Sequence, residues 1–179
     1  CLNPDGRDRY VNWFNSAVGK NYNPDRVARE HREPWPQGRT NHYSFDLNRD
    51  WAWQTQLESR QRLKIYLQWM PQVHVDYHEQ GIIEPYYFAP AAEPLHEVIT
   101  PFQREFQNTI GKNNAKYFDA GNWLYFTKIR FDLLYPSYGD TYPNFNGAIG
   151  MTYEQGGISG GLGVINDEVR LIAALHDDQ

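Results

Sequence analysis

The order of strand-like and helix-like segments along the chain restricts its fold more than any other feature. The clearest strand is QVHVDYH at residues 72–78, in which apolar residues alternate with His74, Asp76 and His78. Alternate residues of a strand face opposite sides of a sheet. Segments of helical length precede and follow this strand, a pattern typical of α/β sheets. We therefore expect an α/β fold with a mixed, partly parallel sheet flanked by helices.

Periodicity and the positions of Gly and Pro predict the other elements. Helices are expected at residues 51–70 and 93–118, with Pro71 ending the first and Pro101 kinking or splitting the second. We further expect strands at 43–48 and 147–157, a short extended piece at 85–90 and a turn at 3–6. Residues 9–19 have weak helical spacing, residues 20–41 are expected to form a long loop, residues 123–135 are an ambiguous apolar segment, and residues 162–176 suggest one more strand or helix. One face of the first helix is predicted to carry Trp53, Leu57, Leu63, Leu67 and Met70.

Composition limits the domain count and the partners. A chain of 179 residues fits one domain, which we expect to span 1–179. The net charge is −5 and basic residues are scattered, which argues against a nucleic-acid partner. No apolar run is long enough to predict a membrane span or a signal peptide. The sequence does not identify the compartment, although we slightly favour a secreted or periplasmic location.

Cys1 is the only cysteine, so the sequence predicts neither an intrachain disulfide nor a cysteine-based metal site. The chain opens directly on CLNPDG, a turn signal with almost nothing before it. We expect a fragment of a longer protein, truncated at both ends.

Polar side chains lie at the ends of three expected strands. Asn48 ends residues 43–48 and Arg49 follows it, His78 ends residues 72–78, and Glu154 comes late in the strand expected at 147–157. Ligands of open α/β sheets bind at the carboxyl ends of the strands. We expect these four side chains to converge, although a salt-bridged helix start also explains the Asn-Arg pair.

Two kinds of chemistry suit these residues. An arginine can hold a carboxylate with two parallel hydrogen bonds. The three polar residues that share one face of the strand at 72–78 are types that can bind a metal, although polar strand faces are common.

The order of these motifs resembles that of the M14-type zinc carboxypeptidases. NPDG at 3–6 is followed by DLNRDW at 46–51, by DYH at 76–78 and by TYE ending at Glu154. The spacing of nine from Arg39 to Asn48 is similar to that of the cytosolic carboxypeptidase branch. The resemblance covers nearly the whole chain and implies a phosphorylase/hydrolase-like fold, one zinc ion, and removal of amino acids from a peptide or protein C-terminus.

The resemblance also implies a role for each matching residue. Asn48 and Arg49 would hold the terminal carboxylate, His78 would bind zinc, and Glu154 would act as the catalytic base. It further implies that Arg39 stabilises the oxyanion, that Asp46 orients a ligating histidine, and that Tyr138 covers the substrate, with Tyr142 and Tyr135 as rivals.

The zinc ligands depart from the family pattern. The family's first two ligands form an H-x-x-E pair upstream of the NPDG turn, and no H-x-x-E occurs in this chain. Catalytic zinc takes three protein ligands, so we expect weak zinc binding and little hydrolysis by this chain alone. Gln80 also stands where the family often has a tyrosine.

Three alternatives to a peptidase stay open. They are a deacylase of the same superfamily, a non-catalytic binding module with this fold, and a glycan-binding or glycan-cleaving domain. Missing strands would leave an exposed sheet edge through which the chain could self-associate.

Overall fold

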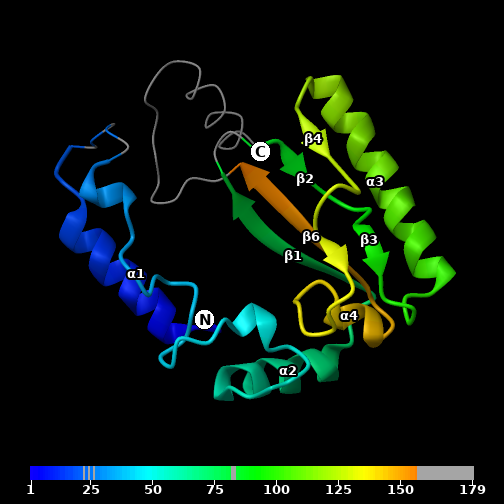
Figure 1. Cartoon of the computed structure of the whole chain (residues 1–179), viewed down its shortest axis with the longest axis horizontal. Coiled ribbons are helices and arrows are strands. Elements are labelled where there is room, and N and C mark those ends of the chain that lie inside the picture. Colours follow the sequence, from blue (N-terminus) through cyan, green and yellow to red (C-terminus); the bar gives the residue numbers. More distant parts are fainter. Residues whose placement is uncertain (22, 24, 26, 82–83, 157–179) are drawn as a thin grey trace. The chain divides into compact units, whose positions relative to one another are not determined.

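The computed structural model describes residues 1–21, 23, 25, 27–81 and 84–156 (Figure 1). The described chain forms two compact units that meet in the sequence between Phe45 and Asp46. The expectation of one domain over 1–179 includes residues outside those described, and it stays a prediction.

The first unit begins with helix α1, Pro4–Ala17, followed by the short helix η1, Arg29–His31. Asn3 caps α1, since its side chain accepts a hydrogen bond from the Gly6 amide at 3.1 Å. Pro4 occupies the first turn, where a missing N–H costs nothing. NPDG is therefore a helix start, and the predicted turn at 3–6 is wrong. The described residues of the expected loop at 20–41 are mostly irregular, as predicted, with η1 as the helical exception.

The predicted strand at 43–48 is also wrong. Asn41 accepts hydrogen bonds from the amides of Tyr43 and Phe45, and Ser44 has a positive φ of 64°. A short helix, η2 (Leu47–Arg49), follows and is capped by the Asp46 side chain. The side chains of Asn41 and Asp46 form hydrogen bonds with nearby backbone amides. These bonds take the place of the inter-strand backbone hydrogen bonds that a strand would make.

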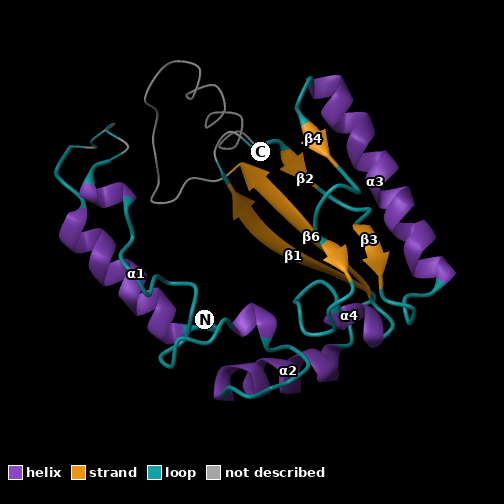
Figure 2. Ribbon diagram, viewed as in Figure 1, coloured by secondary structure: helices purple, strands orange, loops and turns teal. Residues whose placement is uncertain are grey.

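The second unit contains a mixed sheet that confirms the expected α/β class (Figure 2). Its strands lie in the order β1-β6-β2-β4, and β1 pairs with β6 in parallel, whereas β2 pairs with β6 antiparallel. The strands are β1 (Val73–Gln80), β2 (Tyr86–Tyr87), β4 (Tyr125–Phe126) and β6 (Ile149–Gly156), and a small parallel sheet joins β3 (Ala92–Leu95) to β5 (Asp132–Leu133). The helices of this unit are α2 (Leu57–Trp69), α3 (Pro101–Gly121) and α4 (Tyr142–Phe145).

The two faces of the β1–β6 pair differ in chemistry. Ile149 and Met151 are buried on one face, and Phe106 and Ile110 of α3 pack against them. The alternate residues of both strands, which include His78 and Glu154, project from the other face. Helix α3 therefore covers the apolar face of this strand pair, and the polar face lies on the opposite side.

Helix α2 begins six residues later than predicted. Asp50 holds the preceding turn, because its carboxylate accepts hydrogen bonds from the Thr55 amide at 3.0 Å, the Thr55 hydroxyl at 2.8 Å and the Gln56 amide at 2.9 Å. The predicted apolar face is wrong too. Trp53, Leu57, Leu67 and Met70 are exposed, whereas Ser59, Leu63 and Tyr66 are buried.

Helix α3 begins at Pro101 rather than near residue 93. Thr100 and Gln103 form a reciprocal capping box, and Pro101 fits the first helical position, so it does not kink the helix. The residues before it form β3. The strand predicted at 147–157 is present as β6, and the extended piece predicted at 85–90 contains the two residues of β2. The ambiguous segment supplies β4 and β5, and residues 162–176 lie outside the described part.

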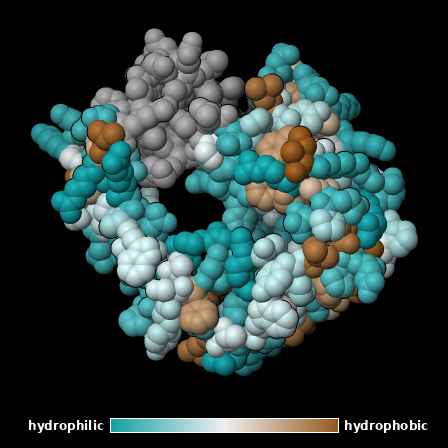
Figure 3. Space-filling model, viewed as in Figure 1, coloured by the Kyte–Doolittle hydropathy of each residue, from teal (hydrophilic) through white to brown (hydrophobic). Residues whose placement is uncertain are grey.

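Strand β1 is at one edge of the four-stranded sheet within the described residues. Tyr77 and Val73 of this strand are exposed, and hydrophobic side chains form separate patches among hydrophilic ones on the face shown in Figure 3. Self-association through this edge stays a prediction. None of the helices described is both long and apolar enough to cross a membrane.

We expect Asp50→Ala to lower the free energy of unfolding by about 1–3 kcal/mol, because it leaves the buried Gln56 amide and the partly buried donors of Thr55 unpaired. Burial alone would raise the pKa of Asp50, but the hydrogen bonds from Gln56 and Thr55 outweigh it, so the pKa of Asp50 lies below its ordinary value. The stabilisation is therefore present above about pH 3.9 and is lost as pH falls through the lower, folded-state pKa. Urea unfolding at several pH values measures this, and Glu97→Ala, at an exposed carboxylate, is the control.

Candidate site at the ends of strands β1 and β6

Parallel pairing of β1 and β6 places His78 directly beside Glu154. The two are register partners, as are Asp76 and Thr152. Partners in adjacent strands project from the same face of a sheet. Glu154 is buried and His78 is partly buried, so an imidazole and a carboxylate lie on one polar, sheltered face.

Asn48 joins these strands from the η2 turn. Its side-chain nitrogen donates to Asp76 Oδ2 at 2.8 Å and lies 3.0 Å from His78 Nε2. His78 Nε2 is also 2.8 Å from Asp76 Oδ2. We call Asn48, Asp76 and His78 the polar triplet. Its centre is Asp76 Oδ2, which contacts the side-chain nitrogens of both Asn48 and His78.

The triplet keeps Asp76 ionised. Burial acts to raise the pKa of Asp76, but the hydrogen bond and charge of His78, with the amide of Asn48, lower it below its ordinary value. His74 shares this strand face but packs edge-on against Trp51 and Tyr66, with ring centroids 5.4 and 5.7 Å away. Burial lowers the pKa of His74, which favours a neutral ring with a packing role.

Gly139 closes the triplet from the loop before α4. A Cβ added at Gly139 would lie 2.3 Å from Asn48 Oδ1, 2.4 Å from Asp76 Oδ2 and 2.9 Å from Trp51 Nε1. Only a residue without a side chain fits there. The Trp51 indole also donates to Asn48 Oδ1 at 3.0 Å, which fixes the orientation of the amide.

The residue after Gly139 in this loop, Asp140, provides a second carboxylate. Asp140 is buried and accepts hydrogen bonds from the hydroxyls of Thr152 at 2.7 Å and Thr141 at 3.1 Å. Burial raises the pKa of Asp140, and the charge of Asp76 raises it further. Sequence reasoning missed both Gly139 and Asp140, because neither belongs to a periodic segment.

Arg49 presents a guanidinium group at the surface beside the triplet. Its Cζ lies 4.2 Å from the centre of the Tyr138 ring, and its Nη1 donates to the Asn48 carbonyl at 3.2 Å. Of the two rivals of Tyr138, Tyr135 packs against it in a tilted arrangement with ring centroids 4.7 Å apart, whereas Tyr142 packs against Trp51 at 5.9 Å. The structure thus brings together Arg49 and Tyr138, two of the residues expected to contact a substrate, and we call Asn48, Arg49 and Tyr138 the Arg49 corner.

Arg62 of α2 supports this corner from inside. Its guanidinium lies 3.8 Å from the centre of the Trp51 ring and donates to the Leu47 carbonyl at 2.9 Å. Burial lowers the pKa of Arg62 to about 10, while nearby aspartates favour the charged form. Arg62 is therefore a cation at neutral pH that holds the η2 turn in place.

Two predicted site residues have other surroundings. The Asp46 carboxylate accepts a hydrogen bond from the Asn48 amide at 2.9 Å, and the carboxylate found on His78 is that of Asp76. Arg39 belongs to the first unit and is exposed, with its carbonyl near the Asn3 side chain. The roles expected of Asp46 and Arg39 stay predictions.

The described residues do not fit a catalytic zinc site by themselves. No three His, Cys, Asp or Glu side chains in the described part of the chain are grouped so that they could hold a metal ion. His78 offers one imidazole, and its Nε2 already lies against Asp76. Catalytic zinc needs three protein ligands and an open position.

Comparisons of the chain with protein-family models, with curated proteins and with solved structures find no match.

Proposed function

We propose that the chain is the peptide-binding part of a zinc carboxypeptidase-like catalytic domain, which removes amino acids from peptide C-termini. The observation that supports this most is the meeting of Asn48, His78 and Glu154, from three distant segments, on one polar face. The order of the motifs in the sequence provides independent support.

Carboxylate binding would fall to Arg49 and Asn48. Arg49 is exposed, stacked on Tyr138 and next to a turn fixed by Arg62, so little side-chain freedom would be lost on binding. A guanidinium can donate two parallel hydrogen bonds to a carboxylate. Tyr138 would cover the bound residue, and Glu154 would accept a proton on the same face as His78.

Zinc in such a domain would lower the pKa of a bound water and polarise the scissile carbonyl. His78 is the residue proposed to bind it. Because the described residues do not complete a zinc site, we derive no step of hydrolysis through the metal.

One observation favours a second candidate, a non-catalytic module that binds peptide C-termini. Anion binding at Arg49 needs only the corner, which is complete within the second unit, whereas the metal site is not. A deacylase of the same superfamily would use the same corner for the carboxylate of an acyl-amino acid.

Titration calorimetry with one peptide in two forms tests the shared part of these proposals. The chain should bind the form with a free C-terminus at least tenfold more tightly than its C-terminal amide, because charge-assisted hydrogen bonds contribute roughly 1.5–3 kcal/mol. Equal affinities would reject the carboxylate-binding corner. An N-acyl-amino acid that binds better than the peptide would favour the deacylase.

A zinc titration tests the expectation that the chain alone binds zinc weakly. We expect no tight, stoichiometric zinc binding and no turnover of a chromogenic C-terminal dipeptide by the chain alone, and we expect His78→Ala to change neither result. Tight binding with turnover would mean that the metal site has been misplaced.

A further inference from the structure

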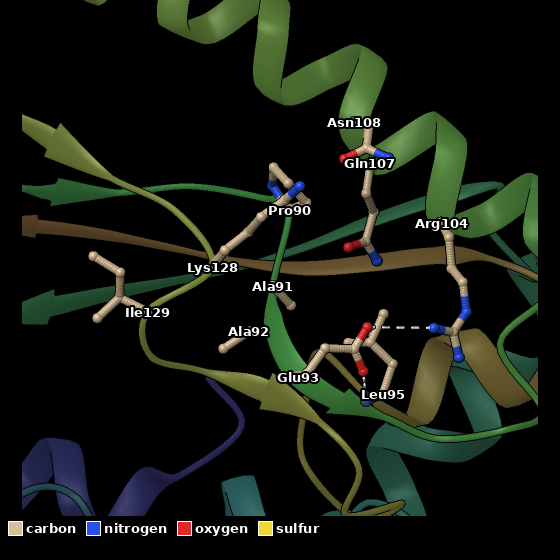
Figure 4. Close-up of a pocket in the computed structure, with 10 residues that line it drawn as sticks. All are labelled: Pro90, Ala91, Ala92, Glu93, Leu95, Arg104, Gln107, Asn108, Lys128 and Ile129. Carbon is tan, nitrogen blue, oxygen red and sulfur yellow. Dashed lines mark hydrogen bonds and ion pairs between the residues drawn. The ribbon is translucent and has the colours of Figure 1, made fainter.

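A cavity of about 510 Å³ in the second unit lies beside α3, and neither His78 nor Glu154 lines it (Figure 4). Its walls are the segment from Pro90 to Leu95, one side of α3, and Lys128 with Ile129. This volume is within the range of about 300–1,000 Å³ that is usual for small-molecule sites.

Hydrogen bonds fix the segments that form the walls of the cavity. The Lys128 amide donates to the Pro90 carbonyl at 3.1 Å, and the Arg104 Nε donates to the Ile99 carbonyl at 3.0 Å. Ala91 and Ala92 are both buried in the wall, and their small side chains leave space that larger ones would fill.

Two polar groups of the cavity have capacity for a ligand. Gln107 is 1% exposed and its Nε2 donates to the Gly150 carbonyl at 3.0 Å, which leaves Oε1 without a donor among the described residues. The Lys128 ammonium has no carboxylate partner within the described part of the chain. Figure 4 shows Gln107 pointing from α3 toward Ala91, and Lys128 extending toward Pro90.

The charges and surfaces define the ligand. Arg104 is paired with Glu93, at 3.6 Å, so the two cations and one carboxylate of the wall leave one net positive charge, that of Lys128. An anionic group would pair with this ammonium, a donor would satisfy Gln107 Oε1, and an aliphatic body would contact Ala91, Ala92 and Leu95. We propose that the cavity binds a small aliphatic carboxylic acid with a hydrogen-bond donor next to the carboxylate, either an α-amino acid or an α-hydroxy acid.

Four ligands with the same six-carbon skeleton test this proposal by NMR titration of the full chain. Leucine and 2-hydroxy-4-methylpentanoate should bind saturably and shift the amide signals of Ala91 and Ala92, and whichever binds more tightly identifies the class. 4-Methylpentanoate, which lacks the donor, should bind about fivefold more weakly. Leucinamide, which lacks the carboxylate, should bind at least about tenfold more weakly.

Lys128→Met should weaken binding of the better acid by about tenfold or more, whereas Lys112→Met, at an exposed lysine of α3, should leave it unchanged. Lys128 is exposed, so a thermal melt should show a folded variant. The proposal is overturned if neither acid binds, if leucinamide binds as well as leucine, or if Lys128→Met leaves the affinity unchanged.

Discussion

Replacing Gly139 by alanine is expected to lower the free energy of unfolding by about 1–3 kcal/mol and to weaken the carboxylate binding proposed at Asn48 and Arg49 by about tenfold or more. The added methyl group would lie 2.3 Å from Asn48 Oδ1 and 2.4 Å from Asp76 Oδ2, well inside van der Waals contact. Either the loop or the triplet must move, and Asn48 is bonded to Asp76 and to Trp51. Urea unfolding and titration with the free-acid peptide measure the two effects.

Gly81→Ala is the matched control for this experiment. A Cβ there would lie 3.4 Å from the Glu84 side chain, which is an ordinary contact. It should change stability by less than about 0.5 kcal/mol. A Gly139→Ala protein with unchanged stability and unchanged peptide binding would mean that the triplet is not packed as described.

Arg49→Ala is expected to remove most of the preference for a free C-terminus. The guanidinium is exposed and makes one hydrogen bond, to the Asn48 carbonyl, so its loss should change stability little. Affinity for the free-acid peptide should fall tenfold or more, while that for the amide should change little, because the amide offers no carboxylate.

Arg60→Ala, at an exposed arginine of α2, is the control and should leave both affinities unchanged. Equal losses for acid and amide in the Arg49→Ala protein would count against a carboxylate clamp. They would instead indicate that Arg49 contacts the peptide through its stem or through Tyr138.

The sequence predicted the elements whose pattern extends over many residues. Strand β1 was found from its alternation and β6 from its apolar run, and their parallel pairing accounts for the meeting of His78 with Glu154. The segment at 43–48 alternates in the same way, yet it is a turn. Side chains of Asn41 and Asp46 bond to nearby amides there, and periodicity alone cannot distinguish the two structures.

Long-range contacts explain what the sequence did not reveal about the site. The expected meeting of Asn48, His78 and Glu154 is present, because they lie near element ends that pair or contact one another, and their roles stay predictions. The partners that fix them come from elsewhere: Arg62 from α2, and Gly139 from the loop before α4. The sequence around these two residues does not indicate a role in the site. An arginine on a helix is usually a solvent-exposed residue, and a glycine in a loop usually allows a turn.

The crystal structure of the chain with a bound peptide that has a free C-terminus tests the central claim most directly. We predict that the carboxylate lies within hydrogen-bonding distance of the Arg49 guanidinium and that the peptide runs along the polar face that carries His78 and Glu154. A peptide whose carboxylate contacts neither Arg49 nor Asn48, or no peptide at this corner at saturating concentration, would contradict the account.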